Sequence, residues 1–194
     1  LTEQELPLAT QQRFAGRLKE RLHELEHQVR DMLVFARGEL PLGDRVTPKA
    51  LFQALQQAAQ AHVQGHAVRW QCDSHLGELL CNRDTLVGAL LNLIENALQA
   101  SDGPARLKVH LYRRERSLHL CVSDAGSGID AGLLGRLGEP FLTTKATGTG
   151  LGLAVVKAVV RAHQGTINLR SKVGRGTCVR VELPLIDGQL AEGV

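Results

Sequence analysis

Aromatic residues, long apolar runs and a strong charge of one sign are all scarce in this chain of 194 residues. Aromatics make up 3% of it, so a core must come from aliphatic side chains, for which the 43% of hydrophobic residues is sufficient. No apolar run reaches the length of a transmembrane helix, and no signal peptide is recognisable. The formal net charge of +3 is small and interspersed, which disfavours a nucleic-acid-binding protein. We therefore expect a cytoplasmic segment that makes no membrane contact.

The four cysteines lack the pairing of a metal site. Cys72, Cys81, Cys121 and Cys178 form no CxxC motif and have no histidine at zinc-finger spacing. We predict that they are buried thiols in a reducing compartment.

The first 40 residues carry a heptad pattern. Apolar residues alternate in steps of three and four along a charged helix, and Gly38 is placed to end it. Residues 41–47 are interpreted as a linker. A seam of this kind needs a partner helix, from upstream or from a second copy of the chain. The seam residues are Ala15, Leu18, Leu22, Leu25, Val29, Met32 and Ala36.

From residue 48 the pattern becomes mixed α/β. We predict helices near 48–64 and 151–163, and a third that begins after a cap at Asp84. Strands are predicted at 67–72 and 78–81, followed by one hairpin of 105–113 with 117–124 and another of 166–171 with 177–184. The simplest packing is an α+β two-layer sandwich, a mixed sheet with three helices on one face. Residues 187–194 are taken as a tail.

One helix carries an unusual polar group of residues. In "LLNLIENALQAS", Asn92, Glu95 and Asn96 share a face beside an apolar stripe, although asparagine is a mediocre helix former. Taken alone, this is best explained as a solvated face.

Three glycine motifs accompany that helix. "DAGSGI" (124–129) follows a strand, "GTGLGL" (148–153) opens a helix, and "GRGT" (174–177) joins two strands. Glycines before a helix can bring backbone N–H groups to a phosphate. Each motif alone has a plainer explanation as a turn, and "GTGLGL" fits neither the dinucleotide fingerprint nor the P-loop.

Together the motifs resemble a known family. "NLIENA" (92–97), "DAGSGI", "EPFLTTK" (139–145), "GTGLGL" and "GRGT" resemble the conserved boxes of sensor histidine kinases, whose ATP-binding fold is shared with type II topoisomerases, Hsp90 and MutL. The resemblance covers residues 48–186 and is nearest to the NtrB-like branch and to flagellar sensor kinases. Residues 1–40 resemble the second helix of the dimerisation and phosphotransfer hairpin.

The resemblance implies ATP and Mg²⁺ as ligands. Asn96 and Asn92 would face the metal, with Glu95 either reaching it through water or lying as a plain surface residue. Asp124 would accept a hydrogen bond from the adenine amine, supported through a water by Thr177. Asn92, Asn96 and Lys145 would be catalytic, and Phe141 would pack the lid. The remaining nucleotide-binding residues would be Gly126, Gly128, Ile129, Thr144, Gly148, Thr149, Gly150, Leu151, Gly152 and Leu153.

The resemblance also implies a reaction. Hydrolytic members of the wider group carry a glutamate base where this chain has Asn92, which cannot take a proton from water. A kinase is therefore expected, with phosphate passing to a histidine and then to the receiver domain of a response regulator such as an NtrC-type activator. The acceptor is expected upstream of Leu1, because His23 lacks the residues that follow a family acceptor. Gln99 departs from the basic residue usual in the family, so either phosphate binding is weaker or Lys145 or an arginine supplies the charge. An anti-sigma-type serine kinase and a nucleotide-binding pseudo-kinase remain alternatives.

Overall fold

A computed structural model describes residues 10–11, 13–16, 18, 41–140, 142–143 and 150–186. Most of the predicted heptad seam and the predicted tail at 187–194 lie outside these residues. No helix in the described ranges is long and apolar enough to cross a membrane.

A five-stranded mixed sheet forms one layer of the fold, in the order β2-β4-β5-β7-β6. β2 (Ala67–Cys72) runs parallel to β4 (Arg106–Arg114), and every other neighbouring pair is antiparallel. The other strands are β5 (Ser117–Asp124), β6 (Thr166–Lys172) and β7 (Gly176–Pro184). Both predicted hairpins are confirmed, because β4 pairs with β5 and β6 pairs with β7.

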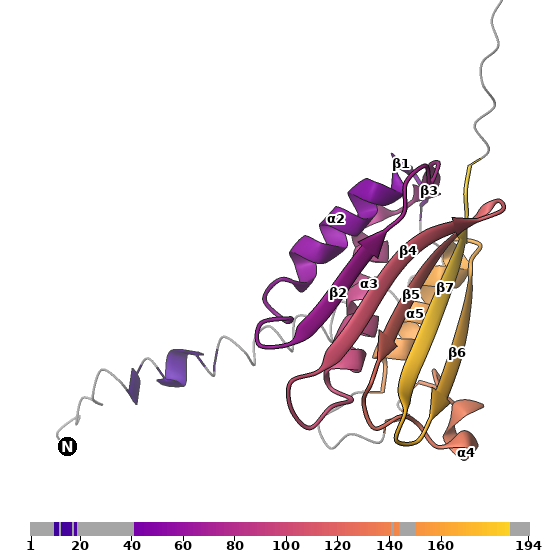
Figure 1. Ribbon diagram of the computed structural model, residues 1–194. Coiled ribbons are helices and arrows are strands. Elements are labelled where there is room, and N and C mark those ends of the chain that lie inside the picture. Colours follow the sequence, from indigo (N-terminus) through magenta and orange to yellow (C-terminus); the bar gives the residue numbers. More distant parts are fainter. Residues whose placement is uncertain are drawn as a thin grey trace, which may run out of the picture.

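Helices α2 (Pro48–Ala59), α3 (Arg83–Leu98) and α5 (Gly152–Ala162) cover one face of this sheet, as Figure 1 shows. The short α4 (Ala131–Leu134) lies near the end of β6. The predicted α+β architecture with three helices on one face is therefore confirmed.

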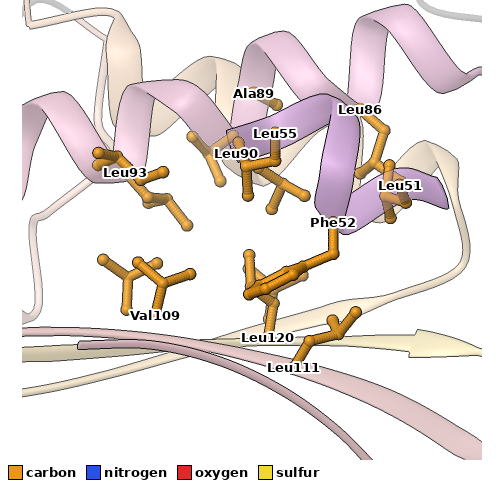
Figure 2. Packing of buried hydrophobic residues seen from close by; sticks show 14 of the residues in the cluster. Leu51, Phe52, Leu55, Leu86, Ala89, Leu90, Leu93, Val109, Leu111 and Leu120 are labelled. Atoms are coloured by element: carbon orange, nitrogen blue, oxygen red, sulfur yellow. The ribbon is translucent and has the colours of Figure 1, made fainter. Parts of the chain in front are cut away.

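Aliphatic side chains fill the space between the layers. In Figure 2, Leu90 and Leu93 of α3 and Phe52 of α2 point toward Val109, Leu111 and Leu120 of the sheet. The strands supply every second residue to this core, which is the period-2 pattern that the sequence displays. Phe52 also meets Trp70 edge to face, with ring centroids 5.6 Å apart. Few aromatics are needed because the aliphatic residues close the core.

Two predictions about this region need correction. Residues 44–46, expected in a linker, form strand β1 (Asp44–Val46), which pairs with β3 (Leu79–Cys81) and buries Val46. The cap of α3 is Asn82, whose Oδ1 accepts a hydrogen bond from the Thr85 N–H at 3.2 Å. Asp84 lies instead in the first turn, where a carboxylate favours the positive end of the helix dipole.

The cysteines also differ from expectation. Cys81 is buried, but Cys72 is exposed and Cys121 and Cys178 are partly exposed. The last two lie on the sheet face opposite the helices, which sequence alternation alone did not make clear.

A buried histidine connects the start of α3 to the end of α5. His163 is 3% exposed, its Nδ1 lies 2.7 Å from the carbonyl oxygen of Val159, and its Nε2 accepts a hydrogen bond from the Asn82 N–H at 3.0 Å. A neutral ring with its proton on Nδ1 satisfies both contacts. Burial lowers the pKa of His163, which favours this neutral form. The connection aligns α3 and α5, whose opposite ends frame the predicted site.

Candidate nucleotide-binding site

Asp124 is held by main-chain groups at the end of β5. Its Oδ1 accepts hydrogen bonds from the N–H of Gly126 at 2.8 Å and from the N–H of Thr177 at 3.2 Å. Burial raises the pKa of Asp124, while these two hydrogen bonds oppose the rise. The carboxylate is thus fixed in orientation with Oδ2 turned from these donors, as a group that selects a hydrogen-bond donor requires.

Gly126 and Gly128 allow the turn after Asp124 to lie against two other segments. A Cβ on Gly126 would be 2.4 Å from the carbonyl oxygen of Ala100, just beyond α3, and that oxygen accepts the Ser127 N–H at 2.9 Å. Gly128 has φ +71°, and a Cβ there would be 2.1 Å from the carbonyl oxygen of Lys172. The turn therefore joins the end of α3 to the β6–β7 turn through contacts that only glycine permits.

Ser171 makes hydrogen bonds on the β6–β7 side of the same turn. The sequence analysis did not identify this residue. Its Oγ accepts the Ile129 N–H at 2.8 Å, donates to the carbonyl oxygen of Gly176 at 3.0 Å and lies 2.9 Å from Oγ1 of Thr177. Thr177 also contacts Asp124 directly through its main-chain N–H, and the water-mediated contact stays a prediction. Register pairs Ser171 with Thr177 across the hairpin, and that pairing was the available signal.

Asn92 and Asn96 lie beside the start of α5. A Cβ on Gly152 would be 3.7 Å from Nδ2 of Asn96 and 3.9 Å from Cγ of Asn92. Asn92 is 3% exposed, whereas Asn96 is exposed. The side chain of Leu151, the N-cap residue of α5, makes no capping hydrogen bond, and the positive end of the α5 dipole lies next to the two amides. This combination suits a phosphate with a cation next to it.

Glu95 is directed elsewhere. Its Oε1 lies 3.2 Å from Nδ1 of His62, in the turn that follows α2. Asn92 and Asn96 approach α5 instead. The three polar residues of α3 therefore contact two different segments, the turn after α2 and the start of α5. The geometry favours the plainer of the two readings of Glu95, as a surface residue.

A Glu95→Gln substitution tests that reading. We expect Mg²⁺-dependent ATP affinity to stay within about twofold of the unmodified chain, because the partly exposed contact between Glu95 and His62 contributes little and is directed away from α5. Titration calorimetry with and without Mg²⁺ gives the measurement, and His62→Gln is the matched control. A loss of tenfold or more in Glu95→Gln alone would restore the water-mediated metal role.

Part of the predicted lid lies outside the described residues: Phe141, Thr144, Lys145, Gly148 and Thr149. The segment just before it is attached to α5, because the Lys157 ammonium donates to the carbonyl oxygen of Leu137. Gly150 has φ +69° and leads into the buried Leu151. Leu153 is partly buried against the core. Lys157 was not identified from the sequence.

The described residues fit a cation shared with phosphates rather than a self-contained metal centre. They include no group of three or more His, Cys, Asp or Glu side chains that could hold a metal ion. Amide oxygens are hard, neutral donors, and Mg²⁺ in such sites keeps waters and takes further oxygens from phosphates. The exposed Asn96 is suited to direct contact, and the buried Asn92 to supporting it.

A separate groove of about 580 Å³ lies between the start of α2 and the edge strand β2. Lys49, Phe52, Trp70 and His75 are among its lining residues. None of the residues predicted for the nucleotide site lines it, so it does not compete with the site at the ends of β5 and β7.

Comparison with known proteins agrees with this geometry. The model of the "Histidine kinase-, DNA gyrase B-, and HSP90-like ATPase" family matches residues 81–187. Sensor protein kinase FleS of Pseudomonas aeruginosa is 72% identical over 186 residues, covering 96% of this chain and 46% of that protein. NtrB of Rhizobium meliloti, a sensory histidine kinase/phosphatase, is 39% identical over 136 residues, covering 62% of this chain and 35% of that protein. The chain thus spans less than half the length of these relatives.

Solved structures give the same result. Full-length ShkA in complex with AMPPNP is 26% identical, with a TM-score of 0.75 over 94% of this chain and 40% of ShkA. The catalytic domain of histidine kinase ThkA, at 22% identity, shares the fold with a TM-score of 0.65 over 73% of this chain and 94% of that domain. Family match and fold agree: the chain belongs to the histidine kinase-, DNA gyrase B- and HSP90-like ATPase family, and it has the fold of a histidine kinase catalytic domain.

Proposed function

We propose that this chain binds Mg-ATP and transfers its γ-phosphate to a histidine on a dimerisation hairpin, as part of a two-component sensor kinase. The observation that carries the proposal is the placement of Asn92 and Asn96 against Gly152 at the start of α5. Asp124, fixed at the neighbouring strand end, supplies the second half of the site.

Asp124 would recognise the adenine base through a hydrogen bond. A carboxylate accepts a hydrogen bond from the exocyclic amine of adenine, whereas guanine carries an oxygen at that position and would be repelled. Because two backbone N–H groups already fix Oδ1, the carboxylate pays little orientational entropy when it binds. ATP is therefore preferred over GTP.

The triphosphate would lie between the α3 amides and the α5 N-terminus. Mg²⁺ held by Asn96, with Asn92 beside it, supplies charge neutralisation when bound. The α5 N–H groups orient the phosphate oxygens, and Lys145 and the glycines of 148–152 would close over them. Asn92 carries no carboxylate, and the neighbouring Glu95 is paired with His62. This supports phosphoryl transfer to another group over rapid hydrolysis, because neither Asn92 nor Glu95 is placed as a general base beside the start of α5.

The wider assignments follow from the relatives. The match to FleS and NtrB supports a homodimer formed through the N-terminal hairpin, a response regulator of the NtrC type as the onward acceptor, and a cytoplasmic location. A role in flagellar gene regulation is part of the same proposal.

Phosphate transfer from labelled ATP tests the activity. The chain is mixed with γ-labelled ATP, Mg²⁺ and the complete dimerisation hairpin, and acid-labile phosphohistidine on the hairpin is the expected product. Asn96→Ala is expected to lower the transfer rate by about 100-fold, because one metal ligand is lost. Its circular dichroism should be unchanged, because Asn96 is an exposed side chain on α3.

The outcomes separate the alternatives. Acid-stable phosphoserine would favour a serine kinase, and ATP binding without any transfer would favour a pseudo-kinase. Full transfer by Asn96→Ala would refute the metal role of that residue.

A further inference from the structure

The face of the sheet opposite the helices carries two thiols in contact. Cys121 of β5 and Cys178 of β7 have their Sγ atoms 3.1 Å apart, and both side chains are partly exposed. The core residues Leu120, Val122 and Val179 alternate with them and point to the helices. The pair is therefore accessible to small solutes and lies outside the proposed nucleotide site.

The two cysteines lie diagonally across the ladder rather than directly opposite. Cys121 pairs with Arg180, and Cys178 pairs with Ser123. Diagonal positions in an antiparallel pair lie wider apart than a disulfide normally spans, so closing a bond requires a small shear of β5 against β7. Disulfides formed under such strain are easily reduced, and these are the ones that serve regulation.

The hydrogen bond that fixes Asp124 lies where β5 ends and β7 begins. Cys178 directly follows Thr177, whose N–H donates to Oδ1 of Asp124 at 3.2 Å, and Asp124 is the last residue of β5. A shear of β5 against β7 therefore changes the hydrogen bond that orients this carboxylate.

We propose that Cys121 and Cys178 form a reversible disulfide that weakens ATP binding at the adjacent strand ends. The effect on ATP rests on the proposed function, whereas formation of the disulfide does not. Hydrogen peroxide is a sufficient oxidant. One thiol loses its proton, the thiolate attacks a peroxide oxygen and the O–O bond breaks. The leaving hydroxide takes up that proton, so a sulfenic acid and water are formed. The second thiol then attacks the sulfenic sulfur, the S–O bond breaks, and a second water leaves. Two thiols lose two electrons in total, and one peroxide is reduced to two waters.

Peptide mapping tests the bond itself. The reduced chain is treated with excess peroxide over an extended time, because burial raises the pKa of Cys121 and leaves little thiolate at neutral pH. After alkylation, mass spectrometry is expected to find the peptides of Cys121 and Cys178 linked, and dithiothreitol should separate them. Cys72→Ser, which removes the exposed thiol in β2, is the matched control and should still form the link. Absence of the link while Cys72 is oxidised in the unmodified chain overturns the proposal.

Calorimetry tests the coupling. Oxidation is expected to weaken ATP binding by about 3- to 10-fold, the effect of disturbing one hydrogen bond. Peroxide-treated Cys178→Ser should keep the affinity of its reduced form. A linked chain with unchanged affinity overturns the coupling. If the reduced chain fails to bind ATP, the proposed function fails. The coupling is then judged by hydrogen exchange of the Thr177 amide. The disulfide should accelerate this exchange in the unmodified chain. Peroxide treatment of Cys178→Ser should leave the exchange rate unchanged.

Discussion

Asp124→Asn is expected to lose ATP affinity by about 100-fold while the domain remains folded. The substitution keeps an Oδ1 acceptor for the N–H groups of Gly126 and Thr177, so the local hydrogen bonds persist. The amide that replaces Oδ2 is a donor, and it faces the adenine amine, which is also a donor. The hydrogen bond between the carboxylate and the adenine amine is thus replaced by a repulsion between two donors in a partly buried site.

The same variant is expected to be at least as stable as the unmodified chain at neutral pH. Burial raises the pKa of Asp124 above its value in the unfolded chain, so the folded state carries a penalty when the carboxyl is ionised. As the pH falls through the folded pKa, the folded chain takes up the proton first and the penalty disappears. The stability advantage of Asp124→Asn should therefore be present at pH 7 and shrink as the solution becomes acidic.

Calorimetric titration with ATP and urea denaturation at several pH values provide the two measurements. Asp130→Asn is the matched control, because Asp130 accepts the Gly132 N–H at 2.8 Å in the same way but caps the exposed α4. Its ATP affinity should change by less than about twofold. Unaltered ATP binding by Asp124→Asn would remove this residue from the site.

Gly176→Ala is expected to destabilise the domain by about 2 to 5 kcal/mol. Gly176 has φ +87°, and a Cβ there would lie 2.1 Å from the carbonyl oxygen of Asp124 and 2.9 Å from Cα of Ala125. Relief of that overlap requires the ends of β5 and β7 to separate. A fall in Tm of roughly 10 °C follows for a domain of this size.

Gly174→Ala is the matched control for this prediction. Gly174 has φ +72° in the same turn, but a Cβ there would meet nothing within 4 Å. The substitution should cost only the left-handed backbone penalty, about 1 kcal/mol. Equal losses in the two variants, measured by thermal denaturation, would show that contact with Asp124 is not the cause.

The regular spacing of apolar residues made the sheet and the helices predictable. Short strands and contacts that depend on strand register could not be predicted from the sequence. The strands β4 and β5 are 9 and 8 residues long, and each places a buried aliphatic residue at three successive alternate positions, which gives a clear period-2 signal. β1 has only three residues and one buried side chain, Val46, so it resembles a loop in sequence. Asn82 and Asp84 are both good caps, and pairing of β3 through Cys81 decided between them.

The site shows the same division. Asp124 and the adjoining glycines follow a strand directly, so local sequence indicated their position. Ser171, Lys157 and the partner of Glu95 depend on contacts between residues distant in the chain, which no local pattern encodes. The contact between Cys121 and Cys178 likewise arises from strand register across 57 positions.

The carboxylate of Asp124 is oriented by peptide groups rather than by other side chains. Mutational drift at Ala125, Arg175 or the Thr177 side chain leaves both N–H donors in place, provided the backbone keeps its course. The proposed preference for adenine should therefore tolerate substitutions of the neighbouring side chains, because the two donors that orient the carboxylate belong to the backbone.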